Sequence, residues 1–384
     1  MAARVLVVDA GERQIEALRG TFSPDACSWD VHFVETCAVA LELMAASPAD
    51  VIVAEDDQLL TEVRRRYPDT ARLVLSSKAD ASAFTSAVGL AHQFMRKPCA
   101  GRELQDAIER ALRLRDQFDD GDILRGDVSQ LAVLPSPSPV FRDLVALIDS
   151  SAADARAVAA ILERDVGLAA KVLQIVNSSF FAPRSRVTSL DVAVVRLGLR
   201  VLRSLILVEE VQREFSATPA VHAWIEKLNG HGYEAGRLAR NLATGADRDD
   251  AFCAGLLHEC GQLVFARSRP GVFAAHLGLR NERCASLSEV ELETFGFTHA
   301  QAGGYLLSLW GFPPEVVDAV AHHDEMPHAT AAHDLRWITQ VANKAADFTY
   351  QPLCGPPVPT VTEEWFAEMG VGDAVAEWAV SEAS

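Results

Sequence analysis

Five histidines in the second half of the chain are the residues best suited to do chemistry. They are His231, His258, His299, His322 and His323, and Glu259 directly follows the second of them. A single histidine on an apolar helix is usually a buried core residue. Several in one region, with a carboxylate beside one, favour a metal site, because imidazole and carboxylate together suit iron, manganese or zinc. The alternative is a hydrogen-bonded polar cluster inside a helical core.

A second group of polar residues follows short apolar runs within the first hundred residues. Asp9, Glu55 and Ser76 end three of these runs, and Lys97 ends another. Ligands of parallel sheets bind beyond the carboxyl ends of the strands. We therefore expect these two acids, the hydroxyl and the amine to border one crevice.

The elements that position this second group are predicted from an alternation of apolar runs and helix-like segments over residues 4–116. The runs are residues 5–8, 31–34, 51–54, 73–75 and 93–95. This alternation predicts an α/β domain at residues 1–118, a doubly wound five-stranded parallel sheet covered by helices on both faces. Its last helix is expected over residues 101–118.

The histidines lie in a region whose sequence pattern differs from that of residues 1–118. Residues 119–139 are polar and then proline-rich (LPSPSPVF), which predicts a linker. Helical patterns alone follow, so residues 140–350 are expected to form an all-α domain. The longest patterns cover residues 154–163, 168–177, 190–197, 199–215, 231–243 and 249–265. Residues 351–384 form a C-terminal tail, helix-like at TEEWFAEM, to which the sequence assigns no role.

Composition argues against several classes of protein. The hydrophobic share of 49% is typical of a soluble globular chain. We expect a cytoplasmic location, since no apolar run approaches the roughly 20 residues of a membrane span and the N-terminus lacks a signal-peptide pattern. A net charge of −18 disfavours nucleic-acid binding. The longest basic cluster, Arg64–Arg66, lies on a helical pattern and is interpreted as a solvated face.

Cysteine usage argues against two further kinds of structure. Seven cysteines without a C-x-x-C spacing argue against a disulfide framework and a structural zinc site. Cys253 and Cys260 lie seven residues apart on an apolar helical pattern, so both are predicted to be buried in the core.

The N-terminal region resembles the receiver domains of response regulators, specifically receivers fused to HDOD domains. The stretches RRRYPDTARLVLSSKAD and AHQFMRKPCAGRELQDAIERALRLRD carry the resemblance. It implies a flavodoxin-like fold in which paired acids hold Mg²⁺, a central Asp accepts phosphate, and Lys and Ser bind the phosphoryl oxygens. The resemblance places Asp9, Glu55, Ser76 and Lys97 in that pocket and Phe94 at the switch aromatic.

The sequence departs from the receiver pattern at two positions. Asp9 is not followed by a second acid, and Glu55 stands where the phosphoacceptor Asp is expected. Glu reaches one methylene further than Asp, and losing an acid weakens Mg²⁺ binding. We therefore expect a pseudo-receiver in which Glu55 pairs with Lys97 and holds one conformation. Phosphorylation at Asp56 or Asp57 is the alternative.

Residues 130–350 resemble the HD superfamily and more closely its HDOD branch. The carrying stretches include ILERDVGLAAKVLQIVNSSFFAPRSRVTSLDVAVVRLGLRVLRSLIL and AFCAGLLHECGQLVFA. An active HD phosphohydrolase needs a His, a His-Asp step and a later Asp. The corresponding positions here hold His231, His258-Glu259 and Asn343, and Gln262 replaces a frequent Lys. A neutral Asn lowers metal affinity and activates a bound water less.

Further histidines extend the resemblance to the cyclic-di-GMP-hydrolysing HD-GYP relatives. His299, His322 and His323 match positions of additional metal ligands in those enzymes. No Gly-Tyr-Pro follows His323, however, and the chain continues with Asp324 and Glu325.

These features lead to the expectation of a non-catalytic bacterial signal-transduction protein, a pseudo-receiver coupled to an HDOD module that binds a protein or a small ligand. No cofactor is expected, with a divalent Fe, Mn or Zn ion as the alternative. Expected partners are signalling proteins such as a histidine kinase or a cyclic-di-GMP enzyme, and a second copy of the chain. The alternatives are a metal-dependent phosphohydrolase of cyclic di-GMP or another nucleotide, a phosphorylation-switched response regulator, and a non-hydrolysing cyclic-di-GMP receptor.

Overall fold

The chain forms two compact units. The computed structural model describes residues 2–9, 11, 15–16, 18–19, 22, 28–77, 91–97, 99–113, 143–144, 147–148, 154–177, 186–199, 202, 219–244, 247–283, 287–328, 334–349 and 361–382. One unit comprises Met1–Val133, Gln174–Arg186 and Leu306–Phe312, and the other comprises Leu134–Leu173, Val187–Tyr305 and Pro313–Ser384. The predicted linker at residues 119–139 and most of the helix predicted over residues 199–215 lie outside the described residues.

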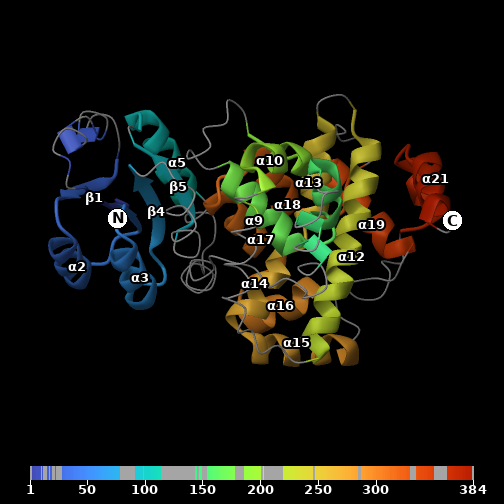
Figure 1. Ribbon diagram of the computed structural model, residues 1–384. Helices are drawn as coiled ribbons and strands as arrows, with labels where there is room; N and C mark the ends of the chain where they lie inside the picture. The colour runs from blue at the N-terminus through green and yellow to red at the C-terminus, as the bar shows by residue number, and fades with distance from the viewer. Residues whose placement is uncertain are drawn as a thin grey trace. The chain divides into compact units, whose positions relative to one another are not determined.

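The first unit is built on a parallel sheet of five strands (Figure 1). The strands are β1 (Arg4–Val8), β2 (Asp30–Val34), β3 (Val51–Ala54), β4 (Ala71–Ser76) and β5 (Gln93–Arg96). Their order is β2-β1-β3-β4-β5, and all neighbours pair in parallel. β3 is buried throughout and β1 nearly so, which explains their uninterrupted apolar sequences. The predicted doubly wound α/β class is confirmed.

Helices flank this sheet. They are α2 (Cys37–Ala46), α3 (Asp57–Arg66) and α5 (Gly101–Arg113). α2 and α3 lie side by side, and α5 lies on the opposite side of the sheet (Figure 1). Thr36 and Asp56 cap α2 and α3, because each side chain accepts a backbone N–H of the first helical turn. The predicted helix over 101–118 is described as far as Arg113.

The second unit is helical, and no strand occurs among its described residues. From α8 onward the helices are α8 (Ala155–Leu162), α9 (Val166–Val176), α10 (Leu190–Leu197), α12 (Pro219–Leu242), α13 (Arg248–Leu257), α14 (Cys260–Ser268), α15 (Pro270–Arg283), α16 (Leu287–Phe295), α17 (His299–Leu309), α18 (Pro314–Ala321), α19 (Leu335–Thr349), α20 (Glu363–Glu368) and α21 (Gly372–Glu382). The long helix α12 packs along α13 and α19 (Figure 1). The predicted all-α class is confirmed.

Two helix boundaries differ from the sequence prediction. α12 begins at Pro219, although its apolar pattern was expected to start at residue 231. The single helix predicted over residues 249–265 is wrong, because the chain breaks between α13 and α14 at His258 and Glu259. The break lets Gly261 approach α17 so closely that a Cβ there would lie 1.8 Å from the His299 carbonyl oxygen.

The C-terminal segment belongs to the folded core of the helical unit. α20 and α21 pack against α12 and α19 in one hydrophobic cluster. Phe366 and Trp378 of this segment are 1% and 2% exposed, as is Trp337 of α19 at 2%. The segment at residues 361–382 is therefore a structural part of this unit.

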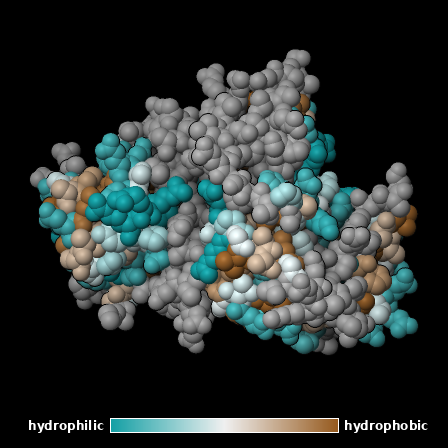
Figure 2. Space-filling view, turned by 90° about the horizontal axis from the view of Figure 1, so that it is seen from below, coloured by the Kyte–Doolittle hydropathy of each residue, from teal (hydrophilic) through white to brown (hydrophobic). Residues whose placement is uncertain are grey.

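On the face drawn in Figure 2, the described hydrophobic residues form small groups among hydrophilic ones. No helix among the described residues is long and apolar enough to cross a membrane. Arg65 and Arg66 are exposed and pair with Glu62, as predicted for a solvated helix face. Cys253 and Cys260 are fully buried, also as predicted.

Candidate functional site

The first candidate site lies where the strands β1, β3, β4 and β5 end. Lys97 Nζ is 2.9 Å from Asp9 Oδ2 and 2.8 Å from Glu55 Oε2. The other Glu55 oxygen, Oε1, accepts hydrogen bonds from Ser76 Oγ (3.1 Å), Ser77 N (2.8 Å) and Ser77 Oγ (2.7 Å). Both oxygens of this carboxylate are therefore held by the residues around it. Ser77 was missed by the sequence prediction, although it adjoins Ser76.

Electrostatic interactions keep Glu55 and Lys97 charged in this pocket. Burial disfavours the ionised form of Glu55, but hydrogen bonds from Lys97 and Ser77 outweigh it and hold the pKa of Glu55 at about 2. Burial likewise opposes the charge on Lys97, yet its bonds to Glu55 and Asp9 raise its pKa above the usual value. Glu55 and Lys97 thus form an ion pair at neutral pH.

The remaining residues are Phe94, predicted as the switch aromatic, and the two alternative phosphorylation sites, Asp56 and Asp57. Phe94 lies in β5, but its side chain is outside the described residues. The Asp56 carboxylate accepts the Leu59 N–H at 2.7 Å, so it serves as the α3 cap. Asp57 begins α3 and its carbonyl accepts a hydrogen bond from Thr61 Oγ1.

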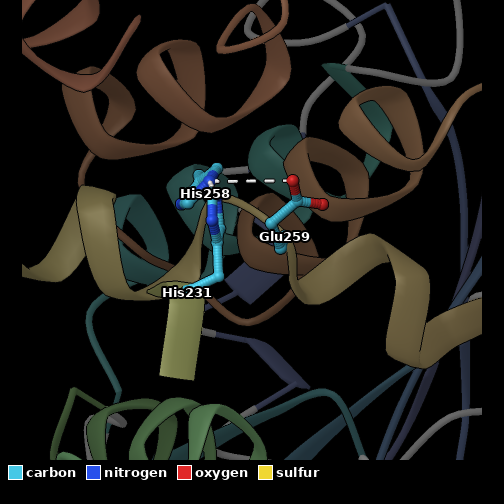
Figure 3. A group of neighbouring side chains, drawn as sticks. All are labelled: His231, His258 and Glu259. Carbon is cyan, nitrogen blue, oxygen red and sulfur yellow. Dashed lines mark hydrogen bonds and ion pairs between the residues drawn. The ribbon is translucent and has the colours of Figure 1, made fainter. Parts of the chain in front are cut away.

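The second candidate site is the histidine cluster of the helical unit. His231 comes from α12, His258 and Glu259 from the break after α13, His299 from the start of α17, and His323 from the turn after α18. The side chains of the last four are 0% exposed. Figure 3 shows His231 and His258 meeting beside Glu259.

Close helix crossings bring these residues together. A Cβ on Gly255 of α13 would lie 2.7 Å from the Gly236 Cα of α12, which brings His258 within reach of His231. At the second crossing, Gly261 of α14 abuts the His299 carbonyl of α17, placing Glu259 beside His299. Larger residues would separate the helices, so these glycines position the cluster.

Ring nitrogens converge on the Glu259 carboxylate. Its oxygens lie 3.2 Å from His299 Nε2, 3.7 Å from His258 Nε2 and 3.9 Å from His323 Nε2. Two pairs of Nε2 atoms also approach to 3.1 Å, His231 with His258 and His299 with His323. The cluster is therefore two adjoining groups that share Glu259.

The opposite ring nitrogens are fixed by acceptors. His258 Nδ1 bonds the Gly255 carbonyl at 2.6 Å, and His323 Nδ1 bonds the Val320 carbonyl at 2.7 Å. His299 Nδ1 bonds Glu291 Oε2 at 2.7 Å. Because each Nδ1–H donates a hydrogen bond to one of these acceptors, Nε2 is directed into the cluster, the arrangement that metal-ligating histidines use.

Charge is distributed unevenly in the cluster. Burial lowers the pKa of His258 to about 3, and nearby His323 adds to the effect. Burial alone would raise the pKa of Glu259, but His299, His258 and the other rings hold it at about 2. For His299, burial is outweighed by Glu291 and Glu259, which raise its pKa to about 10.

One predicted ligand lies apart from the cluster. His322 caps the end of α18, and its Nδ1 contacts the Asp318 carbonyl at 2.9 Å. Its side chain is 37% exposed, whereas the neighbouring His323 is fully buried. The helix end turns two consecutive side chains in different directions, so the expectation that both histidines serve the cluster is wrong.

The structure places one predicted residue in the cluster and adds others that the sequence prediction missed. Asn343 lies where expected, with Oδ1 3.1 Å from His231 Nε2. Glu291 holds His299, and Asp324 Oδ2 lies 3.8 Å from His299 Nε2. Lys344 Nζ lies 3.5 Å from Asp324 Oδ1. Only Asp324 carried a signal, since it repeats the His-acid step of the sequence immediately after His323.

The donor set fits a divalent transition metal. The two groups are His231, His258 and Glu259, and Glu259, His299 and His323, with the donor atoms of each group within 4.8 Å of one another. Imidazole nitrogen and carboxylate oxygen suit iron, manganese or zinc. The residues present could therefore hold such an ion.

Comparison with known proteins identifies the helical region. Residues 134–326 match the HDOD domain family, which is half of the chain. An uncharacterised protein from Treponema pallidum is 27% identical over 224 residues, which cover 57% of this chain and 40% of that protein. The hydrogenase transcriptional regulatory protein HoxA from Cupriavidus necator is 29% identical over 150 residues, covering 36% of this chain and 29% of HoxA. This chain thus spans less than half the length of either curated relative.

Solved structures support the fold. The MmoQ response regulator from Methylococcus capsulatus aligns with a TM-score of 0.50 and 23% identity, covering 64% of this chain and 98% of MmoQ. A virulence factor from Campylobacter jejuni aligns with a TM-score of 0.51 and 18% identity, covering 69% of this chain and 92% of that chain. With its receiver-like sheet followed by the matched helical region, the chain belongs to the HDOD family.

Proposed function

We propose that this chain is a regulatory signal-transduction protein that acts by binding, with a receiver-like domain set in one state by Glu55. The observation that carries the proposal is the set of contacts around the Glu55 carboxylate. It bonds Lys97 on one oxygen and Ser76 and Ser77 on the other. In the receiver family a lysine and a hydroxyl at these positions bind the phosphoryl group, and here a permanent carboxylate engages both.

This arrangement argues against switching by phosphorylation. A phosphoryl group entering the pocket would have to displace a carboxylate whose pKa of about 2 keeps it ionised. Lys97 is already shared between Glu55 and Asp9. The nearby Asp56 serves as a helix cap. The receiver-like domain is therefore a fixed surface for docking a partner.

The helical domain is proposed to be non-catalytic. Hydrolysis of a phosphodiester needs a metal-bound water and a substrate at the same ion. Here Glu259, His258, His299 and His323 are 0% exposed. Asn343 adds a neutral amide where an HD phosphohydrolase carries an acid. Both features favour a closed polar core over an open catalytic centre.

The partners proposed are signalling proteins, such as a histidine kinase or an enzyme of cyclic-di-GMP turnover, together with a second copy of the chain. The formal net charge of −18 favours partner surfaces that are basic. The same charge disfavours nucleic acid.

Acyl-phosphate labelling tests the proposal. The full chain is incubated with acetyl phosphate and Mg²⁺, and its intact mass is compared with that of a receiver domain known to accept phosphate. We expect the control to gain one phosphoryl group and this chain to gain none. A phosphoryl group mapped to Asp56 or Asp57 would favour the phosphorylation-switched alternative and overturn the fixed-receiver proposal.

A further inference from the structure

Helix α17 contributes to both compact units. Its residues up to Tyr305 belong to the second unit, whereas Leu306–Phe312 belong to the first. The helix runs without interruption from His299 to Leu309, so the boundary between the units falls inside it. An α-helix rises about 1.5 Å per residue, which places the two ends of α17 about 15 Å apart. One continuous helix therefore carries a residue of the histidine cluster at its start and a segment of the first unit at its end.

The last turn of α17 contacts α5 within the first unit. Ser308 Oγ donates a hydrogen bond to the Arg110 carbonyl oxygen at 3.1 Å. Ser308 is 8% exposed, and the apolar side chains on both sides of it, Leu307 and Leu309, are fully buried. The end of α17 is therefore packed into the first unit.

The start of β5 is held by two segments that follow it in the sequence. Gln174, in the last turns of α9, donates its Nε2–H to the His92 carbonyl oxygen at 2.7 Å. A Cβ on Gly311 would lie 3.6 Å from Gln93 Oε1 and 3.4 Å from Arg186 Nη1. All five residues belong to the first unit. The ends of α9 and α17 thus fix the position at which β5 begins.

The first half of α17 is packed just as closely within the second unit. A Cβ on Gly304 would lie 2.7 Å from the Ala321 Cβ, at the end of α18. Gly261 of α14 abuts the His299 carbonyl oxygen. Because close-packed interiors transmit displacement, α17 cannot shift along its axis without moving α14 and α18. The side chains that these helices bring to the histidine cluster would move with it.

We propose that α17 couples the receiver-like sheet to the histidine cluster and so holds the helical domain in the state set at Glu55. Strand β5 joins the two ends of this link. Lys97, directly after β5, pairs with Glu55 at 2.8 Å, and Gln93, its first residue, lies beside Gly311. The inference rests on the proposed function, because it describes how a fixed receiver-like domain acts on the rest of the chain. Coupling is reciprocal, so a ligand of the helical domain would also alter the receiver-like sheet.

Hydrogen–deuterium exchange of the full chain tests the coupling. Glu55→Gln removes the ion pair at the end of β5, so the amides of His299–Tyr305 should exchange about 2–10-fold faster than in the unmodified chain. These residues belong to the second unit, and their exchange therefore reports more than loosening of the first. Glu42→Gln, an exposed glutamate on α2, is the matched control and should leave these amides unchanged.

A second substitution should interrupt the link. Gly311→Leu places a side chain against Gln93, so the effect of Glu55→Gln on His299–Tyr305 should disappear in the double variant. Gly370→Leu is the matched control. Its φ of +74° is close to the +77° of Gly311, but nothing lies within 4 Å of its Cβ position. The effect of Glu55→Gln should persist in that background.

A milder pair keeps the test decisive if Gly311→Leu fails to fold. Ser308→Ala removes only the hydroxyl that bonds the Arg110 carbonyl, and it should reduce the effect of Glu55→Gln on α17. Ser268→Ala removes a comparable bond to the Val264 carbonyl within α14 and should not reduce it.

Two outcomes would overturn the inference. One is unchanged exchange of His299–Tyr305 in Glu55→Gln. The other is an effect of Glu55→Gln that persists equally in the Gly311→Leu and Gly370→Leu backgrounds. Neither outcome changes the result of acyl-phosphate labelling, so failure of the coupling and failure of the fixed-receiver proposal are distinguishable.

Discussion

The Lys97 ammonium and the Glu55 carboxylate are held 2.8 Å apart where β3 and β5 end. The same carboxylate accepts bonds from the hydroxyls of Ser76 and Ser77. A permanent side chain thus satisfies the groups that a transient phosphoryl group would otherwise contact. This relationship underlies the proposal that the receiver-like domain keeps one state without a phosphodonor.

Replacing Glu55 by Gln should destabilise the receiver-like domain in a pH-dependent manner. The pKa of Glu55 is lowered from 4.5 to about 2, so its ion pair stabilises the folded state fully above pH 4.5. That stabilisation disappears as pH falls from 4.5 through about 2. The shift corresponds to about 3 kcal/mol at most, and partial exposure reduces the expected effect to about 1 kcal/mol at pH 7.

Thermal unfolding at pH 7 and pH 3 checks this prediction. The difference between Glu55→Gln and the unmodified chain should be roughly half as large or less at pH 3. Glu42→Gln, an exposed glutamate on α2, is the matched control and should behave like the unmodified chain at both values. A pH-independent difference at Glu55 would show that the ion pair contributes nothing.

The crossing of α14 and α17 should not tolerate a side chain at Gly261. A Cβ there would lie 1.8 Å from the His299 carbonyl oxygen and 2.7 Å from the Gly303 nitrogen. Gly261→Ala should therefore destabilise the helical domain by about 3 kcal/mol or more, because backbone cannot move aside as a side chain can.

Circular dichroism melting compares this variant with a second glycine change. Gly278 lies in α15 with nothing within 4 Å of its Cβ position. Gly278→Ala should stabilise that helix by about 0.5–1 kcal/mol. Equal Tm values for the two variants would contradict the close approach that places His299 beside Glu259.

The C-terminal helices should prove essential to the helical unit. Phe366 is 1% exposed and packs edge-on against Phe348 at 5.6 Å between ring centroids. Phe366→Ala should cost about 3–5 kcal/mol through the cavity it creates. Val380→Ser, at a side chain 69% exposed, should change stability by about 0.5 kcal/mol or less. Chemical denaturation of both variants checks this, and a tolerated Phe366→Ala would mean that the segment is dispensable.

Restoring an acid at position 343 should add a second metal position. Asn343 Oδ1 lies 3.1 Å from His231 Nε2, so Asn343→Asp places a carboxylate beside His231 and His258. Metal content should rise above that of the unmodified chain. Asn343→Ala is the control and should leave the content unchanged. An unaltered content in Asn343→Asp would indicate that the second group is closed to ions.

The sheet could be predicted from sequence because its central strands β1, β3 and β4 are short, mostly buried runs bounded by polar residues. The run Val51–Ala54 is buried throughout, and the charged Glu55 marks its end. In a parallel sheet such ends meet at one edge, so Glu55 and Lys97 could be expected to border one crevice. Their pairing was expected from the resemblance to receiver domains. Ser77 was missed because two adjacent serines follow β4 and only one was assigned to the pocket.

The histidine cluster was only partly predictable because its geometry depends on helix ends. His322 and His323 are adjacent in sequence, but the end of α18 directs one to the surface and the other inward. Glu291 lies on another helix, eight residues before His299, and no local pattern connects the two. The break at His258 was missed because the apolar pattern runs through it without a proline. The break brings Gly261 against α17, and this tertiary contact has no local sequence pattern.

The most direct test of the central claim, regulation without catalysis, is a hydrolysis assay of the full chain with cyclic di-GMP and linear nucleotides. The protein is reloaded in turn with Fe²⁺, Mn²⁺ and Zn²⁺, beside an active HD-type phosphodiesterase. Because the metal-facing side chains of His258, Glu259, His299 and His323 are buried, we predict no turnover above the metal-free blank. Metal-dependent turnover that His258→Ala abolishes would contradict the account and establish the chain as a phosphohydrolase.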